Sequence, residues 1–575
     1  MKGENTMTEF SGKVALITGA ANGFGKALAI EAASRGMKLA LVDIDNADLT
    51  GTTAVLRNLG AEVLPINADV TLFSEVQAAV KKTLEAYGSI DLLFCNAGIA
   101  PAGDIFHLPP RDWRWAAYSN LVSHGYFMHE VLPVMIKQGT PAHIITTASI
   151  AGIVHGIGNN PAYSATKHGA VALAEDIRAF CRLNNINNIG VSVYCPGYVQ
   201  TDLHHSERHR PVRFSAPSDP YYSSEHFLET VARVNVNIST GIPIDSVGKR
   251  LFKAVEDNQL YIITHPQYLP YIEARHRKIE SDAGMPDGCP DTLPGNYEGQ
   301  VALITGAASG FGLEFAKAAA KRGMKLALVD INDEGLAAAK RYFDSNNVEC
   351  IALRTDVSLY DEVRASVRET MKAFGKIDVM FCNAGIAPCG SVASLPPADW
   401  EWAVETNVLS HAYYYYEVLP IMVKQGTPAK ILTTASIAGL VPGFGLNPAY
   451  SATKHGAVAL SESVSMKLKD LGYDFIQVSI YAPGFVQTDL HHSYDHKPAR
   501  FVVAGDPYYS SAEYAARLKG TEHSIVTGIP LDGVGERLFK GIDGGQKYIL
   551  THPQYLPKLQ DRHAEIENDI KREKA

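Results

Sequence analysis

Two tyrosine–lysine pairs form the clearest chemical pattern in this sequence. Tyr163 and Lys167 stand four residues apart in the segment NPAYSATKHGAVAL, which returns later in the chain with Tyr450 and Lys454. Residues four apart on a helix lie on the same face. An ammonium beside a phenol favours the phenolate and lowers the pKa of the tyrosine from its usual value of about 10. Each pair therefore predicts a proton donor and acceptor that works near neutral pH.

A serine stands upstream of each pair. Ser149 ends the segment HIITTAS, and Ser436 holds the same position before the second pair. A hydroxyl there would hydrogen-bond a substrate oxygen as negative charge develops on it. Together the three residue types indicate proton exchange with the oxygen of an alcohol or a carbonyl.

Each copy of this pattern is preceded by a glycine-rich loop. TGAANGFG spans 18–25 and TGAASGFG spans 305–312, and each follows an apolar run and opens a segment with helical periodicity. Gly19 would permit the tight turn, while Gly23 and Gly25 would let the backbone approach a pyrophosphate at a helix N-terminus. The candidate dinucleotide-binding residues are Gly19, Asn22, Gly23, Phe24 and Gly25 in the first loop and Gly306, Ser309, Gly310, Phe311 and Gly312 in the second.

An aspartate ends the apolar run that follows each loop, Asp43 in the first copy and Asp330 in the second. A carboxylate at this point accepts hydrogen bonds from a ribose 2′-hydroxyl and repels a 2′-phosphate. The loop residues Asn22 and Ser309 are neutral, so neither of them offers a cation to such a phosphate. NAD is therefore favoured over NADP as the cofactor.

Alternating strands and helices must position these residues. Apolar runs that read as buried strands alternate with helical periodicity, as at Phe24–Arg35. This alternation predicts an α/β fold of the doubly wound Rossmann type, in which a parallel sheet carries helices on both faces. The strands expected in the first copy are Lys13–Thr18, Lys38–Asp43, Asp91–Cys95, His143–Thr147 and Val191–Tyr194.

The whole pattern occurs twice at constant spacing. GMKLALVDI stands at 36–44 and at 323–331, and THPQYLP starts at 264 and at 551, so that 323 − 36 and 551 − 264 both give 287. So long a period indicates duplication of a whole domain, because solenoid repeats are only about 20–50 residues long. A segment rich in Pro, Gly and Asp separates the copies. The predicted organisation is a first domain at 1–281, a linker at 282–299 and a second domain at 300–575.

In these motifs the chain resembles the short-chain dehydrogenase/reductase family, in the branch with TGxxxGxG and YxxxK. The resemblance rests on the glycine-rich loop, NAG at 96–98, the serine, the tyrosine–lysine pair and PGYVQT at 196–201, each with a counterpart in the second copy. It implies that the tyrosine exchanges the proton, the lysine binds the nicotinamide ribose and the serine positions the substrate oxygen. It further implies that Asn120 and Asn407 help to hold a proton-relay water. The implied cofactor contacts are Asp69, Val70, Asn96, Gly98, Pro196 and Thr201, and Asp356, Val357, Asn383, Gly385, Pro483 and Thr488.

The same resemblance makes the polar and aromatic stretch 201–241 a substrate-binding lid. The two copies differ there, with HSERHRPVRFSAPSDPYY in one and HSYDHKPARFVVAGDPYY in the other, which suggests the hypothesis that the two sites accept different substrates. Family members pair through the helices that carry the asparagine and the tyrosine. We therefore expect an intramolecular pseudo-dimer, which a second chain would double into a pseudo-tetramer. The tryptophans are expected to pack in the core rather than to bind substrate: Trp113, Trp115, Trp400 and Trp402.

The bulk composition argues against several kinds of partner. The net charge is −9, the pI is about 6.1 and no block of like charge stands out, so nucleic acid is not expected to bind. No run of about 18 apolar residues predicts a membrane span. The seven cysteines include no Cys-x-x-Cys and are expected to be reduced thiols in the cytoplasm. The histidine pairs at 204–205 and 491–492 lack a third ligand at a recognisable spacing, so no metal site is predicted.

The leading functional prediction is an NAD(H)-dependent oxidoreductase acting on a small molecule. It would interconvert a secondary alcohol and a ketone by hydride transfer, with tyrosine as acid and base. A tandem 3-hydroxyacyl-CoA dehydrogenase or 3-ketoacyl reductase is an alternative, although no hydratase domain follows and the ending REKA is not a peroxisomal signal. An NAD-binding scaffold or sensor without turnover is a third reading. It predicts loss of a tyrosine or lysine from one copy, whereas both copies keep them. The sequence specifies neither the substrate nor the physiological direction.

Overall fold

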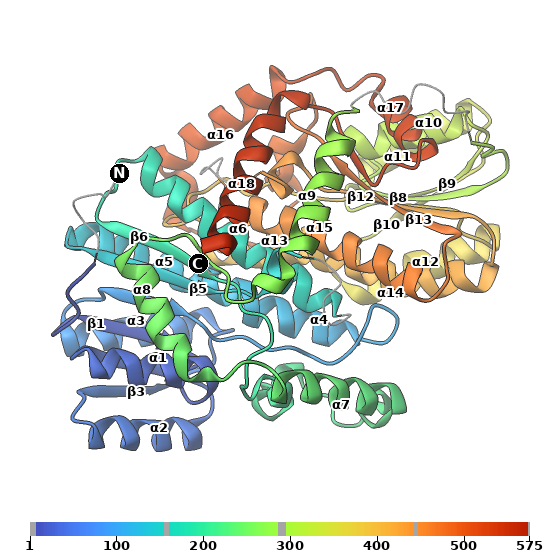
Figure 1. Ribbon diagram of the computed structural model, residues 1–575. Helices are drawn as coiled ribbons and strands as arrows, with labels where there is room; N and C mark the ends of the chain where they lie inside the picture. Colours follow the sequence, from blue (N-terminus) through green and yellow to red (C-terminus); the bar gives the residue numbers. More distant parts are fainter. Residues whose placement is uncertain (1–6, 155–159, 286–294, 442–446, 573–575) are drawn as a thin grey trace.

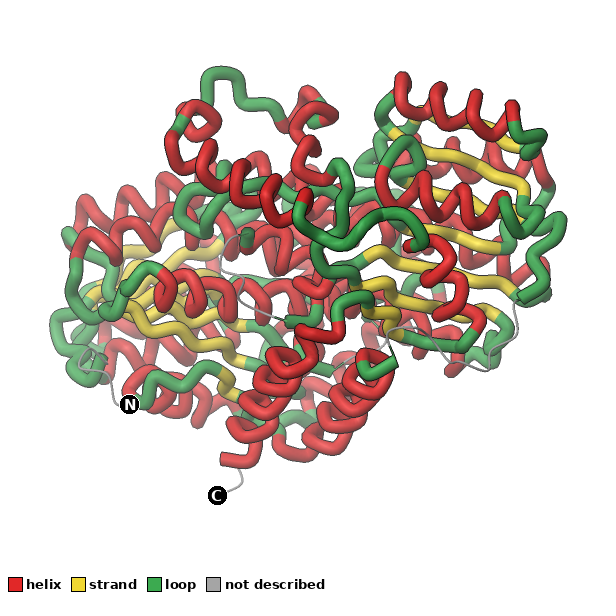
Figure 2. Tube along the Cα trace, turned by 90° about the horizontal axis from the view of Figure 1, so that it is seen from above, coloured by secondary structure: helices red, strands yellow, loops and turns green. Residues whose placement is uncertain are grey.

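The computed structural model describes residues 7–154, 160–285, 295–441 and 447–572. These residues form two α/β units, each built on a seven-stranded sheet with the orders β3-β2-β1-β4-β5-β6-β7 and β10-β9-β8-β11-β12-β13-β14. The paired strands run parallel throughout both sheets. Figure 2 shows the two sets of strands, each covered by helices on both faces. The expected class, two doubly wound parallel-sheet units in tandem, is confirmed.

The strands of the two sheets correspond one to one. The first sheet contains β1 Val14–Thr18, β2 Lys38–Asp43, β3 Val63–Asn67, β4 Leu92–Cys95, β5 Ala142–Thr147, β6 Ile189–Tyr194 and β7 Tyr261–Ile262. The second contains β8 Val301–Thr305, β9 Lys325–Asp330, β10 Cys350–Arg354, β11 Val379–Cys382, β12 Ala429–Thr434, β13 Ile476–Ala482 and β14 Tyr548–Leu550.

The helices repeat in the same way. The first unit contains α1 Gly23–Ser34, α2 Asn46–Asn58, α3 Phe73–Tyr87, α4 Pro110–Ala117, α5 Ser123–Gln138, α6 Pro161–Leu183, α7 Glu225–Ser239, α8 Val247–Glu256 and α9 Leu269–Ala283. The second contains α10 Gly310–Ala320, α11 Asp333–Ser345, α12 Tyr360–Phe374, α13 Pro397–Val404, α14 Ser410–Gln425, α15 Pro448–Asp470, α16 Ala512–Val526, α17 Val534–Asp543 and α18 Leu556–Arg572.

The strands lie where the buried apolar runs predict them. All residues of β1 and β4 are buried, as is required of a parallel sheet that is covered on both faces. The expected strands start or end within two residues of the observed ones. Two strands of the first sheet are not predicted. The edge strand β3 contains Pro65 and is partly exposed, and β7 is only two residues long.

The strand order reverses between β1 and β4 in the first unit and between β8 and β11 in the second. Ligands of doubly wound sheets bind at such a point, beyond the carboxyl ends of the strands. The glycine-rich loops follow β1 and β8 directly, and Asp43 and Asp330 end the neighbouring strands β2 and β9. The topology therefore gathers the candidate cofactor residues at one edge of each sheet.

The two units pack against each other along α6 and α15, the helices that carry the tyrosine–lysine pairs. A Cβ at Gly169 would lie 3.0 Å from the carbonyl oxygen of Ala452, and a Cβ at Gly456 would lie 3.2 Å from that of Ala165. The glycines thus let the helices approach closely enough for one backbone to touch the other. Whether two chains assemble further stays a prediction.

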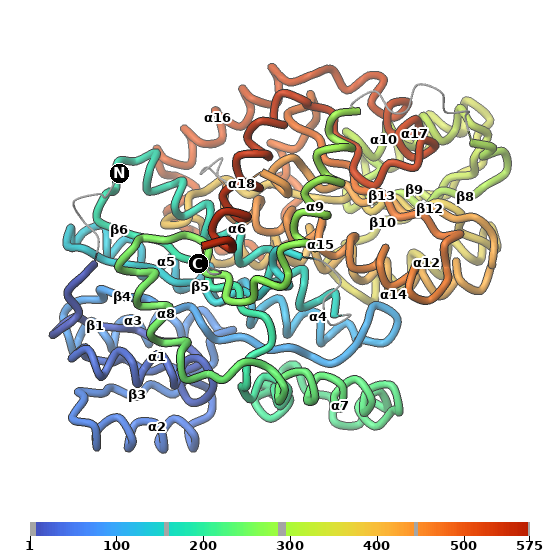
Figure 3. Tube along the Cα trace, in the orientation of Figure 1, coloured from blue at the N-terminus to red at the C-terminus, as the bar shows by residue number. Residues whose placement is uncertain are grey.

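The last helix of each unit packs against the other unit. In Figures 1 and 3, α9 lies among elements of the second unit and beside α18. The Asp282 carboxylate on α9 accepts a hydrogen bond from the backbone N–H of Tyr548 in β14 at 3.0 Å. Reciprocally, Asp569 on α18 accepts one from the backbone N–H of Tyr261 in β7 at 3.2 Å. The two terminal helices are therefore exchanged between the units.

Buried ion pairs accompany the exchange. Arg562 on α18 lies 3.0 Å from Glu175 on α6, and their side chains are 5% and 1% exposed. Tyr261 donates its hydroxyl hydrogen to the same carboxylate at 2.5 Å. Arg275 on α9 pairs with Glu462 on α15 at 3.0 Å in the equivalent position. Each terminal helix therefore bonds to the helix of the other unit that carries the tyrosine–lysine pair.

The two exchanged helices meet at a histidine pair. The rings of His276 and His563 stack with centroids 3.7 Å apart and planes 6° apart. Each ring also bonds to a glutamate of the opposite helix, since His276 lies 2.8 Å from Glu567 and His563 lies 2.5 Å from Glu280. This stack marks the local two-fold relationship between the units.

Of the predicted linker, residues 286–294 lie outside the described residues. After them, the backbone N–H of Gly295 and the hydroxyl of Tyr297 donate to Asp543 of the second unit at 3.0 and 2.5 Å. The domain boundaries themselves stay a prediction. In the part of the chain that the structure describes, no helix is both long and apolar enough to cross a membrane.

Candidate active site

The glycine-rich loop of the first unit turns tightly onto the start of α1. Gly19 and Gly23 have φ values of +63° and +51°, which favour glycine. A Cβ at Gly25 would overlap the carbonyl oxygen of Gly19, so the helix packs directly on the turn. A Cβ at Gly98, across the loop, would lie 3.1 Å from the Lys167 ammonium. This cradle of glycines leaves the room that a dinucleotide needs.

The Asp43 carboxylate is fixed at the end of β2. One of its oxygens accepts a hydrogen bond from the backbone N–H of Ala21, and the other accepts one from Asp45, both at 2.9 Å. Burial raises the pKa of Asp43 above its usual range, and these two bonds act in the opposite direction. Asp330 is held in the same way by Ala308 at 2.9 Å. Each aspartate thus presents its carboxylate at a constant place beside the loop.

Asn96 joins the ends of three strands. Its amide donates to the carbonyl of Thr18 at 3.0 Å, and its amide oxygen accepts from the hydroxyl of Thr147 at 3.1 Å. Asn383 makes the equivalent contacts in the second unit, to Thr305 and Thr434. These asparagines fix the spacing between the glycine-rich loop and the strand that leads to the serine.

Tyr163 and Lys167 lie on one face of α6, which begins at Pro161 and is capped by Asn160. The Lys167 ammonium donates to the carbonyl of Thr147 at 2.9 Å and lies 5.6 Å from the centre of the Tyr163 ring. Burial lowers the pKa of Lys167 to about 8. Both side chains therefore sit in the desolvated environment that makes a pKa sensitive to a bound ligand.

The pKa of the tyrosine differs from the expectation. Burial raises the pKa of Tyr163 to about 12, and a hydrogen bond from Ser149 offsets only part of this rise. The lysine is bonded to a carbonyl instead of to the phenol, so its charge does not outweigh the burial. Tyr450 shows the same upward shift of its pKa through burial. In the chain alone, each tyrosine is a protonated phenol.

Ser149 begins the short turn that links β5 to α6. Its hydroxyl oxygen accepts from the backbone N–H of Ala151 at 3.1 Å, and its hydroxyl group lies 3.4 Å from the carbonyl of Pro196. Ser436 has the same two contacts, with Ala438 and Pro483. The serine is thus held by the backbone beside the tyrosine.

Asn120 lies in a π-helical turn, Tyr118–Val122, between α4 and α5. Its amide oxygen accepts from the backbone N–H of Ile99 at 2.8 Å, while its amide N–H group donates to Ile99 and to Thr166 at 3.0 and 3.1 Å. The side chain therefore ties the NAG loop to the catalytic-helix candidate α6. Asn407 repeats these contacts from the π-helical turn Glu405–Leu409.

One cavity in each unit brings the candidate residues together. In the first unit, Gly25 and Asn120 lie behind the wall, and the wall itself contains Gly19, Asn22, Gly23, Phe24, Asp43, Asp69, Val70, Asn96, Gly98, Ser149, Tyr163, Lys167, Pro196 and Thr201. In the second unit, Gly312 and Asn407 lie behind it, and the wall contains Gly306, Ser309, Gly310, Phe311, Asp330, Asp356, Val357, Asn383, Gly385, Ser436, Tyr450, Lys454, Pro483 and Thr488.

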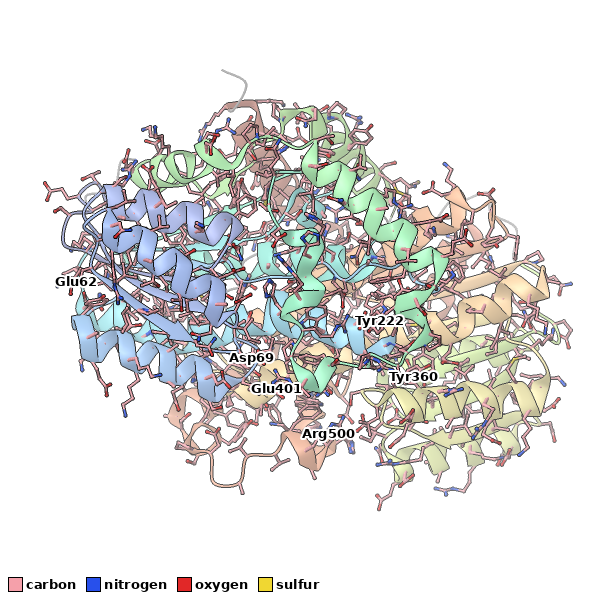
Figure 4. The ribbon with its side chains drawn as sticks, turned by 90° about the horizontal axis from the view of Figure 1, so that it is seen from below. Glu62, Asp69, Tyr222, Tyr360, Glu401 and Arg500 are labelled. Carbon is pink, nitrogen blue, oxygen red and sulfur yellow. The ribbon has the colours of Figure 1, made fainter. Side chains whose placement is uncertain are left out.

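Two bonds that the sequence motifs do not reveal anchor each lid. Arg213 of the lid lies 3.2 Å from Asp69, an expected cofactor contact, and Arg500, labelled in Figure 4, pairs with Asp356 at 2.7 Å. Tyr222 of the DPYYSS segment, also labelled there, donates to Asp112 on α4 at 2.7 Å. Because DPYYSS recurs in both copies, it was the available signal for this anchor.

His265 of the THPQYLP segment is a further residue of the site that the sequence motifs do not reveal. It accepts from the backbone N–H of Gly197 and bonds through its other ring nitrogen to the carbonyl of Tyr198, at 2.9 and 3.1 Å. His552 bonds to Gly484 and Phe485 identically. Each histidine therefore holds the loop that carries Pro196 and Thr201 or their counterparts. The recurrence of THPQYLP was the signal for it.

The tryptophans are buried, as expected, but two of them also face the cavities. Trp115 lines the first cavity and Trp402 the second. Trp400 packs instead on Gly125 of the other unit, where a Cβ would lie 2.8 Å from the indole ring. The sequence pattern does not distinguish these roles, because all four tryptophans occur in the equivalent helices α4 and α13.

Comparisons with known proteins agree with this geometry. The family model described as short chain dehydrogenase matches residues 13–211 and again residues 300–499. A CLA biosynthesis dehydrogenase/reductase of Lactiplantibacillus plantarum is 48% identical over 281 residues, which are 49% of this chain and 97% of that protein. A levodione reductase of Leifsonia aquatica is 33% identical over 229 residues, which are 39% of this chain and 81% of that protein.

Two solved structures were also compared. The C-domain of a bacterial malonyl-CoA reductase with NADP covers 95% of this chain and 99% of its own, with a TM-score of 0.61 at 16% identity, a likeness that shows the fold. A short chain dehydrogenase/reductase from Burkholderia phymatum in complex with NAD is 33% identical, covers 48% of this chain and 96% of its own, and has a TM-score of 0.45. The family model matches twice along most of both units, and each match coincides with one doubly wound sheet. The chain therefore belongs to the short-chain dehydrogenase/reductase family of NAD(P)-binding oxidoreductases and carries two such domains in tandem.

Proposed function

We propose that the protein is an NAD(H)-dependent oxidoreductase that interconverts a secondary alcohol and a ketone at two sites. The observation that carries this proposal is the shared cavity wall of Ser149, Tyr163 and Lys167 with the glycine-rich loop and Asp43, which recurs complete in the second unit. The names of the two relatives, a dehydrogenase/reductase and a reductase, support the same reaction type.

The residues divide the chemistry among them. A bound nicotinamide dinucleotide would supply or accept the hydride. For ketone reduction, the protonated phenol of Tyr163 donates its hydrogen to the carbonyl oxygen, so the oxygen gains a proton as the carbon gains the hydride. Ser149 holds that oxygen by a hydrogen bond. Lys167, anchored on the carbonyl of Thr147, places a cation where it stabilises the phenolate that remains.

The preference for NAD rests on the charges at the ribose end. The Asp43 carboxylate is fixed there by two backbone N–H groups. Among the described residues that line the first cavity, Lys167 is the only lysine or arginine, and it lies at the tyrosine end. A 2′-phosphate would meet a carboxylate without a lysine or arginine of the described wall to balance it. We therefore propose NAD as the cofactor of both sites.

The test is a cofactor and substrate screen on the full chain. Oxidation of NADH and of NADPH is followed with aliphatic ketones, steroids, aryl ketones and 3-ketoacyl-CoA esters. We expect NADH to be used with a simple ketone, and the Tyr163→Phe, Tyr450→Phe double variant to lose about 100- to 10,000-fold of the rate. Turnover of acyl-CoA esters alone would favour the tandem 3-ketoacyl reductase, and cofactor binding without turnover would favour the scaffold.

A further inference from the structure

The lid helices present different side chains to the two cavities. In Figure 1, α7 lies at the lower edge of the molecule and α16 at the upper edge. The face of α7 toward the first cavity is mainly apolar and consists of Thr230, Val231, Val234 and Ile238. The face of α16 toward the second cavity is more polar and consists of Glu513, Ala516, Arg517, Gly520, Thr521, Ser524 and Ile525.

Aligned at the constant spacing of the repeat, Arg517 stands where the first lid has Thr230, and Thr521 stands where it has Val234. Ile525 and Ile238 are unchanged. The substitutions therefore fall on the part of the helix face that precedes this shared isoleucine. They exchange a methyl group for a hydroxyl and introduce a guanidinium.

The cavities also differ in size, although Arg517 is a larger side chain than Thr230. The first has a volume of about 280 Å³ and the second about 870 Å³. Gly520 and Ala516 leave space along α16 that larger side chains would fill. The second cavity therefore has room for a longer molecule beyond the reacting carbon.

The position of the charged groups differs as well. In the second unit, Arg517 bonds to Glu513 at 2.8 Å, and both line the cavity. In the first unit His226 stands where the second has Glu513, and the acidic loop residue Asp104 pairs with Lys467 at 3.0 Å; neither His226 nor Asp104 belongs to the described cavity wall. An arginine–glutamate pair therefore lines the second cavity, whereas the described wall of the first cavity has none.

Glu513 is held by more than the arginine. Its carboxylate accepts hydrogen bonds from Ser394 at 2.7 Å and from Ser391 at 3.2 Å. These bonds fix the carboxylate of Glu513 to the loop. They therefore also fix the position of the Arg517 guanidinium that is bonded to it. A guanidinium has five N–H donors in a plane and suits the two oxygens of a carboxylate.

We infer that the second site acts on a longer ketone or alcohol whose far end carries a hydrogen-bond acceptor, foremost a carboxylate, whereas the first site acts on an apolar one. The inference rests on the proposed function, because it names the substrate class for each of the two sites. Arg517 and Thr521 are the residues that would recognise the polar end. Val231 and Val234 are those that would exclude it.

The experiment compares methyl hexyl ketone with the same chain ending in a carboxylate in place of the terminal methyl group. Tyr450→Phe leaves the first site as the working one, and Tyr163→Phe leaves the second. With NADH, we expect kcat/KM to favour methyl hexyl ketone at least about tenfold at the first site and the oxocarboxylate at least about tenfold at the second. Equal ratios at the two sites would overturn the inference.

A residue exchange locates the source of the difference. Arg517→Thr, in the Tyr163→Phe background, is expected to reduce the preference of the second site for the oxocarboxylate about tenfold, mainly through KM. Lys519→Thr is the matched control, because it removes a positive charge from the exposed side of the same helix. Equal loss of preference in both variants would attribute the effect to net charge and would contradict recognition by Arg517.

Failure of the proposed function gives a different result. A protein that binds NADH but reduces neither ketone would refute the oxidoreductase proposal. Calorimetry of the NADH-loaded full chain then decides the inference: the oxocarboxylate is expected to bind the chain with Arg517 at least about tenfold more tightly than the Arg517→Thr variant. Equal Kd values would overturn it.

Discussion

The imidazole of His265 accepts a hydrogen bond from the backbone N–H of Gly197 at 2.9 Å. Burial lowers the pKa of His265, so the ring is neutral and keeps an acceptor nitrogen. The bond ties the segment after β7 to the loop that carries Thr201. This part of the first cavity wall is therefore shaped by a residue that lies after the lid in the sequence.

Replacing this histidine should loosen one site only. His265→Ala leaves the N–H of Gly197 without its partner, and we expect the KM for NADH at the first site to rise about tenfold while kcat changes less. The assay uses the Tyr450→Phe background, in which the first site works. His552→Ala is the control, because in the same background it should leave this KM unchanged. An equal rise in both variants would indicate a general loss of structure.

Gly25→Ala should abolish cofactor binding at the first site. The added Cβ would overlap the carbonyl oxygen of Gly19, and backbone atoms cannot move away as the end of a flexible side chain can. The matched control is Gly51→Ala on α2, where a Cβ meets no atom within 4 Å and should stabilise the helix by about 0.5–1 kcal/mol. NADH fluorescence titration of the full chain measures the number of sites, which should fall from two to one. An unchanged number of sites in Gly25→Ala would show that the loop does not carry the cofactor.

The buried ion pair between α18 and α6 predicts a large stability effect. Arg562→Met leaves the carboxylate of Glu175 buried without its cation, which should cost about 3–5 kcal/mol of the free energy of unfolding. Adding Glu175→Gln should recover part of this loss. Chemical denaturation monitored by circular dichroism measures the difference.

The control for that variant is a more exposed pair between the same two helices. Arg178 and Glu565 lie 2.6 Å apart, with side chains 22% and 41% exposed. Arg178→Met should therefore cost only about 0–1 kcal/mol, because solvent screens the pair. If both variants lose the same stability, the buried pair has no special part in holding α18.

The stacked histidines predict sensitivity to acid. Burial, reinforced by the neighbouring cations Arg275 and Arg562, lowers the pKa of His276 and of His563 well below the ordinary value of about 6.5. The unfolded chain therefore binds these protons more readily than the folded chain. The stability that neutral histidines provide is complete above pH ~6.5 and falls as the pH decreases below it.

The measurement is the Tm of the full chain between neutral and mildly acidic pH. His276 also faces Glu567, and His563 faces Glu280, so these carboxylates oppose the effect while they stay ionised. Replacing both histidines by glutamine should flatten the fall of Tm below pH ~6.5. An unchanged slope would show that other groups govern the acid response.

The local part of the structure could be predicted from the sequence. The glycine-rich loops, Asp43 and the tyrosine–lysine pairs lie within a few residues of the elements that position them, and the rule for parallel sheets brings those elements to one edge. The conserved spacing of the repeat then transferred each assignment to the second unit. The edge strand β3 was missed, because its partly exposed residues lack the continuous apolar character of the central strands.

The exchange of the terminal helices could not be predicted, and the repeat itself is the reason. Asp282 bonds to the backbone of Tyr548 in the other unit, although Tyr261 offers the same chemical group in its own unit. Because both units offer equivalent partners, loop lengths and the shapes of the packing surfaces decide which unit each terminal helix contacts. The role of His265 was missed for a related reason, because 68 residues separate it from Gly197.

The exchanged helix α18 also determines the order in which the chain can be completed during synthesis. The first unit emerges from the ribosome long before its covering helix, which is made at the end of the second unit. Until then Glu175 lacks Arg562 and the backbone N–H of Tyr261 lacks Asp569. The half that is translated first is therefore completed only when the last helix of the chain has been made.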